Sequence, residues 1–246
     1  MPLEFEIPPH RGLFITGTDT GVGKTLIAGA IAKVLSQQQL RVGAFKPVAT
    51  GCRRRREGLI SADTEFGAFC ANCDYPLSVV TPITFATPAA PAACEQVERK
   101  IVDFEHIVNT YKYICDNTDI VIVEGIGGIR VPISQGIDVL DLAEAFNLPV
   151  VIVARPDLGT INHTLLTVDA VRSAGLPVAG VVISGYDLDC GDVAVETAPA
   201  IIAEYGNVDI LAAVPWDPES DVEKGLLGPT TLDIIEQTDW RQIART

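Results

Sequence analysis

A glycine-rich segment carries the residues whose types and spacing have the clearest chemistry. It reads Gly17-Thr-Asp-Thr-Gly-Val-Gly-Lys-Thr25, after an apolar run and before a helical pattern. In that context backbone N–H groups and the helix start form a positive hollow that cradles phosphates. We expect Lys24 to meet the β and γ phosphates of a nucleotide and Thr25 to ligate Mg²⁺. The predicted phosphate-binding residues are Asp19, Thr20, Gly21, Val22, Gly23, Lys24 and Thr25.

The segment departs from the strict phosphate-loop spacing. Counting back from Gly23, the form G-x-x-x-x-G-K-[ST] needs glycine at Thr18, whereas the glycine stands one residue earlier, at Gly17. A glycine-rich turn without a ligand is the alternative, but the preceding strand and the following Lys-Thr favour phosphate binding. Phosphoryl transfer at such a loop depends on positioning and charge neutralisation, so no protein nucleophile is required.

The rest of the chain must position this loop, and it alternates short apolar runs with amphipathic stretches. Ile27, Ile31, Val34 and Leu35 have helical spacing directly after the loop. Apolar strands separated by helices indicate a parallel sheet covered on both faces. We predict strands over residues 12–16, 41–46, 119–124, 149–154, 177–183 and 208–214, and helices over 104–115, 138–146, 192–205 and from a Thr160 cap onward.

These elements predict an α/β fold of the P-loop NTPase type. We expect one domain over residues 1–246, with a parallel sheet of about seven strands covered by helices on both faces and a flexible lead-in over residues 1–11. In such a sheet the ligand lies beyond the carboxyl ends of the strands. Residues that directly follow strands are therefore the candidates for function.

Composition excludes several classes of function. The net charge of -14 repels phosphate backbones and anionic lipid, so we expect neither nucleic acid nor a membrane surface as partner. We find no run of 18 apolar residues and no signal-peptide pattern, which favours the cytoplasm. The six cysteines are then expected to be reduced thiols. Cys70-Ala-Asn-Cys73 would form a zinc site only with further ligands, for which Cys52 and Cys94 are loose candidates.

Four segments together resemble the dethiobiotin synthetase family. They are the phosphate loop, Phe45-Lys-Pro-Val-Ala-Thr-Gly51, Val123-Glu-Gly-Ile-Gly-Gly128 and Leu158-Gly-Thr-Ile-Asn-His163, in the family's order and at similar spacing. The resemblance runs from residue 12 to about residue 216 and implies an enzyme that uses MgATP, CO2 and 7,8-diaminopelargonate. One substrate amine forms a carbamate, which takes the γ-phosphoryl group, and the second amine closes the ureido ring. Family members are typically homodimers.

The resemblance also implies a metal site and a charge-stabilising lysine. Asp63 and Glu124 would complete the Mg²⁺ site with Thr25, because hard oxygen ligands suit this ion. Lys46 would join Lys24 as a catalytic residue by meeting the carbamate and the γ-phosphate. On sequence alone Asp63 could instead cap a helix, and Lys46 could be an ordinary surface lysine.

The remaining site residues implied by the resemblance would bind the substrate and the base. Thr50 would hydrogen-bond the substrate amines, and the helix start at Gly159, Thr160, Ile161 and Asn162 would hold its carboxylate in the partner subunit's site. We expect a packing role for His163. The nucleotide base would lie near Ser184 and Pro215. Many members of the family have asparagine at the position of Ser184, and a hydroxyl cannot replace the amide's donor–acceptor pair.

Two alternatives to this function remain open. A nucleotide-switched ATPase of the partition type shares the fold, but its phosphate loop usually begins with a signature lysine that Gly17-Thr-Asp-Thr20 lacks. An amidating ligase of the cobyrinate type would need a glutaminase domain for which the 246 residues leave no room. Arg53 to Arg56 form either a solvated loop or a local attractant for anionic ligands.

Overall fold

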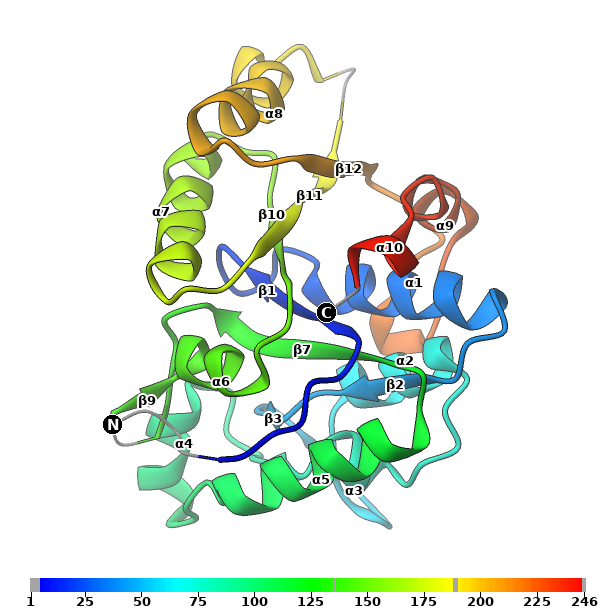
Figure 1. Cartoon of the computed structure of the whole chain (residues 1–246), viewed down its shortest axis with the longest axis vertical. Helices are drawn as coiled ribbons and strands as arrows, with labels where there is room; N and C mark the ends of the chain where they lie inside the picture. Colours follow the sequence, from blue (N-terminus) through cyan, green and yellow to red (C-terminus); the bar gives the residue numbers. More distant parts are fainter. Residues whose placement is uncertain (1–4, 135, 188–189, 245–246) are drawn as a thin grey trace.

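A six-stranded parallel sheet forms the centre of the computed structural model, which describes residues 5–134, 136–187 and 190–244 (Figure 1). The strand order is β12-β11-β10-β1-β7-β2. The strands are β1 (Gly12–Gly17), β2 (Val42–Phe45), β7 (Ile120–Gly128), β10 (Val150–Ala154), β11 (Val178–Tyr186) and β12 (Ile210–Pro215). The sheet has six strands, where about seven were predicted.

Helices cover both faces of this sheet (Figure 1). On one face α1 packs against β1, β7 and β2, and it is flanked by α2, α9 and α10. On the other face α5, α6, α7 and α8 contact the strands. Their bounds are α1 (Lys24–Gln37), α2 (Ala62–Ala71), α5 (Phe104–Asn117), α6 (Val139–Phe146), α7 (Thr160–Ser173), α8 (Val193–Gly206), α9 (Pro229–Glu236) and α10 (Trp240–Ile243).

Short elements fill the connections. Within the described residues, the remaining helices are α3 (Leu77–Val80), α4 (Pro91–Glu98) and the 3₁₀ turn η2 (Val222–Lys224). Three two-stranded ribbons pair β3 (Val48–Ala49) with β6 (Ile83–Thr84), β4 (Arg53–Arg55) with β5 (Gly58–Ile60), and β8 (Pro132–Ser134) with β9 (Ile137–Asp138). Strand β4 carries three of the four consecutive arginines and is exposed, whereas its partner β5 is half-buried.

The alternation of side chains along the strands divides the apolar core into two layers. In β1, Leu13 and Ile15 join the layer that contains α1, whereas Phe14 joins the layer beneath α5, α6 and α7. All five residues of β10 are buried because helices cover both of its faces. Burial on both sides fixes the register of the strands. The register in turn fixes where the last residue of each strand lies along the edge of the sheet.

Every predicted site residue except Asp63 follows or ends a strand of the central sheet, or lies in the segment that such a strand leads into. The loop after β1 leads into α1, Lys46 follows β2, Glu124 lies within β7, and Ser184 and Pro215 lie at the ends of β11 and β12. Because all six strands are parallel, these positions share one edge of the sheet. The fold thus collects residues that are distant in sequence.

Some predictions differ from the structure. Thr160 does not cap α7; Gly159 is the cap residue, and the Thr160 side chain is buried as the first helical residue. The proposed lead-in lies partly outside the described residues, and within the remainder Ile7 packs against the core. In the described part of the chain, no helix has both the length and the apolar character needed to cross a membrane.

Candidate active site

The glycine-rich loop wraps around the start of α1. Gly23 precedes the helix with a positive φ of 93° and packs against Ser184 on β11, where a Cβ atom would lie 2.4 Å from the hydroxyl oxygen. A side chain is therefore excluded by both conformation and space. Lys24 curls back and donates from Nζ to the carbonyl oxygen of Asp19 at 2.7 Å. The loop is a closed turn whose first helical N–H groups have no acceptor within the helix.

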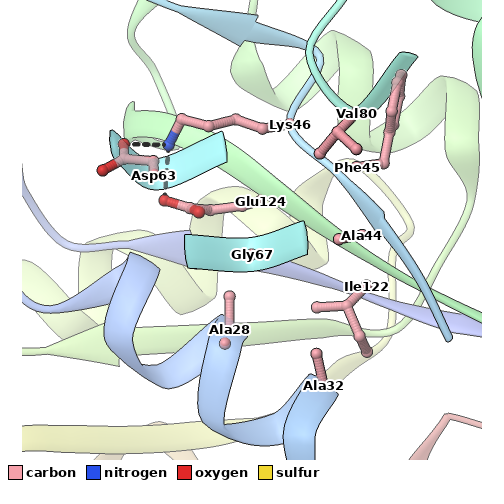
Figure 2. Close-up of a pocket in the computed structure, with 11 residues that line it drawn as sticks. Ala28, Ala32, Ala44, Phe45, Lys46, Asp63, Gly67, Val80, Ile122 and Glu124 are labelled. Atoms are coloured by element: carbon pink, nitrogen blue, oxygen red, sulfur yellow. Dashed lines mark hydrogen bonds and ion pairs between the residues drawn. The ribbon is translucent and has the colours of Figure 1, made fainter. Parts of the chain in front are cut away.

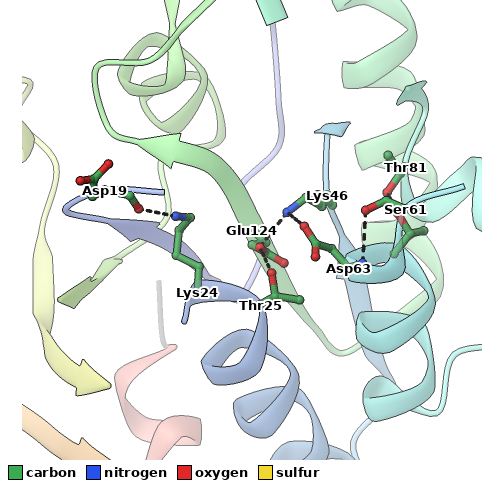
Figure 3. A network of polar contacts seen from close by, with 9 residues as sticks. Asp19, Lys24, Thr25, Lys46, Ser61, Asp63, Thr81 and Glu124 are labelled. Carbon is green, nitrogen blue, oxygen red and sulfur yellow. Dashed lines mark hydrogen bonds and ion pairs between the residues drawn. The ribbon is translucent and has the colours of Figure 1, made fainter. Parts of the chain in front are cut away.

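A compact charged cluster lies next to this loop (Figure 3). Lys46 Nζ lies 2.7 Å from Asp63 Oδ2 and 2.7 Å from Glu124 Oε1. Thr25 donates its hydroxyl hydrogen bond to the same Glu124 oxygen at 2.7 Å. Lys46 and Glu124 are 5% and 7% exposed, so both charges are withdrawn from solvent. Four residues from α1, α2, β7 and the segment after β2 thus meet at one point.

Burial and mutual attraction set the charge states of this cluster. Burial alone would lower the pKa of the Lys46 ammonium, but the charges of Glu124 and Asp63 outweigh it and raise that pKa above its usual value. Burial also raises the pKa of Glu124, whereas Lys46 holds the pKa of Asp63 below its usual value despite burial. Lys46 therefore remains a cation at neutral pH, between the two carboxyl groups.

Lys24 differs electrostatically from Lys46. Burial lowers the pKa of Lys24 to about 8, with Glu124 opposing the shift. Its ammonium has a backbone carbonyl as partner, rather than a carboxylate. An added anion near the loop would favour the protonated form. Lys24 is thus the lysine that gains most from a phosphate group.

A cleft of about 420 Å³ opens over the loop and the charged cluster. Its lining includes residues that the sequence analysis selected for phosphate, metal and substrate binding: Thr20, Gly21, Gly23, Lys24, Thr25, Lys46, Thr50, Asp63 and Glu124. Asp19 lines a neighbouring hollow instead, and Val22 is buried in the core, so neither side chain faces the cleft. A phosphorylated ligand would therefore meet several cationic, hydroxyl and carboxylate groups at once.

The oxygens of Thr25, Asp63 and Glu124 fit a magnesium ion that also binds phosphate. Thr25 and Glu124 are in direct contact, and Lys46 bridges Glu124 to Asp63. Mg²⁺ commonly takes one or two protein carboxylates and completes its shell with phosphate oxygens and water. The ammonium of Lys46 now bridges the two carboxylates, so an ion would have to share them with it.

Ser184 and Pro215 lie on adjacent strands at the same sheet edge. Ser184 pairs in register with Val214, and Tyr186 with Pro215. Ser184 faces Gly23, so the hydroxyl supports the phosphate loop. Trp216 follows Pro215 and is 76% exposed. Neither Ser184 nor Pro215 lines the cleft, so their predicted contact with the base remains a prediction.

The start of α7 also lies outside the cleft lining. Gly159 and Asn162 are exposed, and Leu158 beside them is 83% exposed. The N–H of Thr160 already donates to Asp157 at 3.0 Å, so the free donors of this turn are those of Ile161 and Asn162. Within a single chain, the start of α7 therefore takes no part in lining the cleft.

Sequence reasoning missed the residues that close the cleft on its far side. Val222 and Glu223 of η2 line it, and Arg53 of the β4–β5 ribbon reaches Glu223 at 2.9 Å. Arg55 similarly pairs with Glu65 at 3.6 Å. The 3₁₀ turn spans three residues and has no apolar periodicity, so the sequence contains no signal that could have revealed it.

The cysteines contribute nothing to this site. All six are free, and burial raises the pKa of the Cys70 and Cys73 thiols. Across residues 5–134, 136–187 and 190–244, no three His, Cys, Asp or Glu side chains are grouped as a metal site. The zinc alternative for the Cys70–Cys73 segment therefore finds no ligand set in the described chain.

Comparison with known sequences identifies relatives across most of the chain. A family model described as an AAA domain matches residues 11–224. An ATP-dependent dethiobiotin synthetase of Endomicrobium trichonymphae is 38% identical over 88% of this chain and 98% of its own length. The protein of the same name from Bacillus licheniformis is 42% identical over 83% of this chain and 86% of its own.

Comparison with solved structures identifies the fold. The Aquifex aeolicus MinC:MinD cell division complex contains a chain with a TM-score of 0.60 at 14% identity, with 96% of both chains covered. The septum site-determining protein MinD of Pyrococcus horikoshii, complexed with Mg-ADP, has a TM-score of 0.57 at 16% identity, with 93% of both chains covered. At such identities the likeness concerns the fold alone.

Proposed function

The chain belongs to the family of ATP-dependent dethiobiotin synthetases, and on that premise we propose that it closes the ureido ring of dethiobiotin from 7,8-diaminopelargonate, CO2 and MgATP. One observation carries the proposal beyond family membership. Lys24, Thr25, Lys46, Asp63 and Glu124 converge on a single cleft at the carboxyl edge of the sheet. That set suits phosphoryl transfer to a carboxylate-like oxygen.

The reaction divides into three balanced steps. The lone pair of one substrate amine forms a C–N bond to CO2, a C=O electron pair moves to oxygen, and the nitrogen releases a proton to solvent. A carbamate oxygen then bonds to the γ-phosphorus of ATP while the bond to ADP breaks. Finally the second amine attacks the carbamoyl carbon, phosphate departs with the bonding pair, and the amine loses a proton.

The residues of the cleft have separate proposed roles in these steps. Lys24 and the loop N–H groups hold the β and γ phosphates, and Lys46 neutralises charge that develops on the transferred group. Thr25, Asp63 and Glu124 would hold Mg²⁺, which supplies charge neutralisation when bound. Thr50 lines the same cleft and is proposed to orient the substrate amines.

We further propose a homodimer in which α7 of the partner completes the substrate site. The free N–H groups at Ile161 and Asn162 would bind the substrate carboxylate. The exposure of Asn162 and Leu158 supports this arrangement. We keep the cytoplasm as the proposed location, because ATP is the co-substrate.

Phosphate release with product analysis tests the proposed function. The purified protein is given MgATP and bicarbonate, with and without 7,8-diaminopelargonate, and the product is followed by mass. We expect phosphate only with diaminopelargonate, in equal amount to dethiobiotin. Phosphate release that ignores diaminopelargonate, without dethiobiotin, would instead support the nucleotide-switched ATPase, which the named relatives at 38% and 42% identity favour less.

A further inference from the structure

The run of four arginines, Arg53 to Arg56, is a feature of the sequence that the proposed function does not use. All four side chains are exposed, and three of them belong to strand β4. The ribbon of β4 and β5 lies between two parts of the site in the chain, because Thr50 precedes it and Asp63 follows it. The arginines are therefore placed near the cleft.

Alternate arginines of β4 pair with acids on two neighbouring elements. Arg53 Nη2 lies 2.9 Å from Glu223 Oε2 on η2. Arg55 Nη2 lies 3.6 Å from Glu65 Oε2 on α2. Residues two apart in a strand share one of its faces, so both arginines reach out from the same side of the ribbon. The two pairs have the same chemistry, but only Glu223 lines the cleft.

The 3₁₀ turn η2 has no buried side chain of its own to hold it at the cleft. It packs beside α2, but none of its three residues is buried. Asp221 accepts from the N–H of Lys224 at 3.2 Å and from its ammonium at 2.6 Å, which shapes the turn internally. Among the ion pairs of residues 5–134, 136–187 and 190–244, the Arg53–Glu223 pair is the one that links η2 to another element.

The same pair balances the charge of the cleft. The charged residues in the lining include one carboxylate more than ammonium groups, namely Lys24 and Lys46 against Asp63, Glu124 and Glu223. Figure 2 shows Lys46 in contact with the carboxylates of Asp63 and Glu124. Glu223 has Arg53 as its cationic partner. Without Arg53, a carboxylate at the cleft would repel the phosphates of a nucleotide.

We propose that Arg53 is a positioning residue for nucleotide binding, which acts through Glu223 by holding η2 at the cleft and by neutralising a carboxylate that faces the phosphates. The inference rests on the proposed function, since the cleft must take MgATP. Arg55 has no such part, because its partner Glu65 lies outside the cleft lining. A general attraction of anions would instead make Arg53 and Arg55 count alike.

Matched glutamine substitutions test the proposal by calorimetric titration with MgADP. We expect Arg53→Gln to raise the Kd about threefold, the scale of one exposed ion pair. Arg55→Gln removes the same charge from the same strand and should bind MgADP as the wild type does. In a Glu223→Gln background, Arg53→Gln should change the Kd no further, because residues that act as a pair are not additive. All these variants should melt with the wild type, since the replaced side chains are exposed.

Three further readouts separate positioning from a structural role. In turnover, Arg53→Gln should raise the KM for ATP and leave kcat unchanged, because Arg53 does not line the cleft. At 1 M salt, screening should abolish the difference from the wild type. Without nucleotide, the amides of residues 224–226 should exchange hydrogen faster in Arg53→Gln than in Arg55→Gln, because the turn has lost its attachment.

Several results would overturn the positioning role. They are an unchanged Kd in Arg53→Gln, an equal loss of affinity in Arg55→Gln, a loss that persists in the Glu223→Gln background, or equal hydrogen exchange in the two variants. The proposed function fails separately. A wild type that binds MgADP but makes no dethiobiotin contradicts the function, and the calorimetry still decides about Arg53. A wild type that makes dethiobiotin, with the same Kd in Arg53→Gln, contradicts only the positioning role.

Discussion

At the scale of single residues, the site depends on one lysine between two carboxyl groups. Lys46 contacts Asp63 and Glu124 at 2.7 Å each, and Thr25 shares the Glu124 oxygen. Removing one partner from a buried charge cluster leaves the others uncompensated. Lys46 therefore stabilises the apo site, in addition to the catalytic role proposed for it.

Replacing Lys46 separates these two roles. We expect Lys46→Met to lower kcat by about 10²–10³-fold through lost charge stabilisation. The variant should also lower the free energy of unfolding by about 3 kcal/mol, because Asp63 and Glu124 are left facing each other. Both effects are measured on one preparation, by phosphate release and by denaturant unfolding.

Magnesium provides the internal check on this variant. An ion that binds Asp63 and Glu124 should restore part of the stability of Lys46→Met, and the gain from MgCl2 should exceed that of the wild type. Lys33→Met on α1, away from the cluster, is the control and should respond as the wild type does. Equal responses in all three proteins would contradict the assignment of the metal ligands.

Not every site residue could be assigned from its type. The glycine-rich loop predicts Lys24 and Thr25, and the family resemblance adds Lys46, Asp63 and Glu124, but neither predicts the neighbour of Ser184. The structure places its hydroxyl against Gly23, a contact between β11 and the phosphate loop that no local pattern encodes. Likewise the backbone N–H of Thr160 is used by Asp157, which removes it as a ligand donor.

At the scale of elements, the sequence predicts the sheet far better than its connections. All six predicted strands are present, because each contains a short apolar run. β1, β2 and β10 are buried along their whole length, whereas β12 at the edge of the sheet is largely half-buried. The segment between β2 and α5 was missed, since it consists of strands of two or three residues and helices of four to ten residues. Asp63 owes its place to this segment: Ser61 caps α2 by accepting from the Asp63 N–H at 3.2 Å. The helix-cap alternative for Asp63 is therefore wrong.

The C-terminal helices were also missed, and one buried aspartate fixes their position. Asp217 accepts hydrogen bonds from the N–H and hydroxyl of Thr231 at 2.9 and 3.1 Å and from the N–H of Glu219 at 3.0 Å. Gly228 packs so closely that a Cβ there would lie 2.3 Å from the carboxylate. Such long-range anchoring leaves no periodic trace in the sequence.

Asp217→Asn should destabilise the fold in a pH-dependent way. Burial opposes the charged form, but the hydrogen bonds outweigh it and lower the pKa of Asp217. Its contribution is therefore complete above the unfolded pKa of about 3.9 and is lost as the pH falls through the lower folded pKa. We expect a loss of about 1–3 kcal/mol at pH 7 that shrinks below pH 4.

Urea unfolding of the wild type and Asp217→Asn between pH 3 and pH 7 measures this difference. Asp233→Asn, on the exposed side of α9, is the matched control and should differ little from the wild type at any pH. A deficit of Asp217→Asn that stays constant to pH 3 would show that the carboxylate charge is not what anchors the segment.

At the scale of the whole molecule, the proposed dimer makes two distant parts of the chain into one site. Lys46 and the start of α7 would then serve the same substrate from different subunits. Asn162→Asp is a useful probe because an acidic residue in the first turn favours the helix while repelling an anionic substrate. Each variant alone, Lys46→Met or Asn162→Asp, should be nearly inactive as a homodimer.

Mixing the two variants should restore activity. A two-fold symmetric dimer with one substitution in each subunit has one site with both defects and one with neither. Random reassociation should then return about a quarter of the wild-type activity, since half of the dimers are mixed and each has one intact site of two. Activity that stays at the sum of the separate variants would contradict a shared site, and sedimentation of the wild type gives the oligomeric state directly.

The contact of one ammonium with two carboxylates also restricts how these three residues can change during evolution. Position 46 lies in the segment after β2, position 63 in α2 and position 124 in β7, yet a change at any one leaves the charges of the other two unbalanced. A different set of residues at these three positions can therefore arise only through a destabilised single mutant or through two substitutions made together. We expect the three positions to be inherited as a unit, so that a relative lacking the lysine also lacks one of the acids.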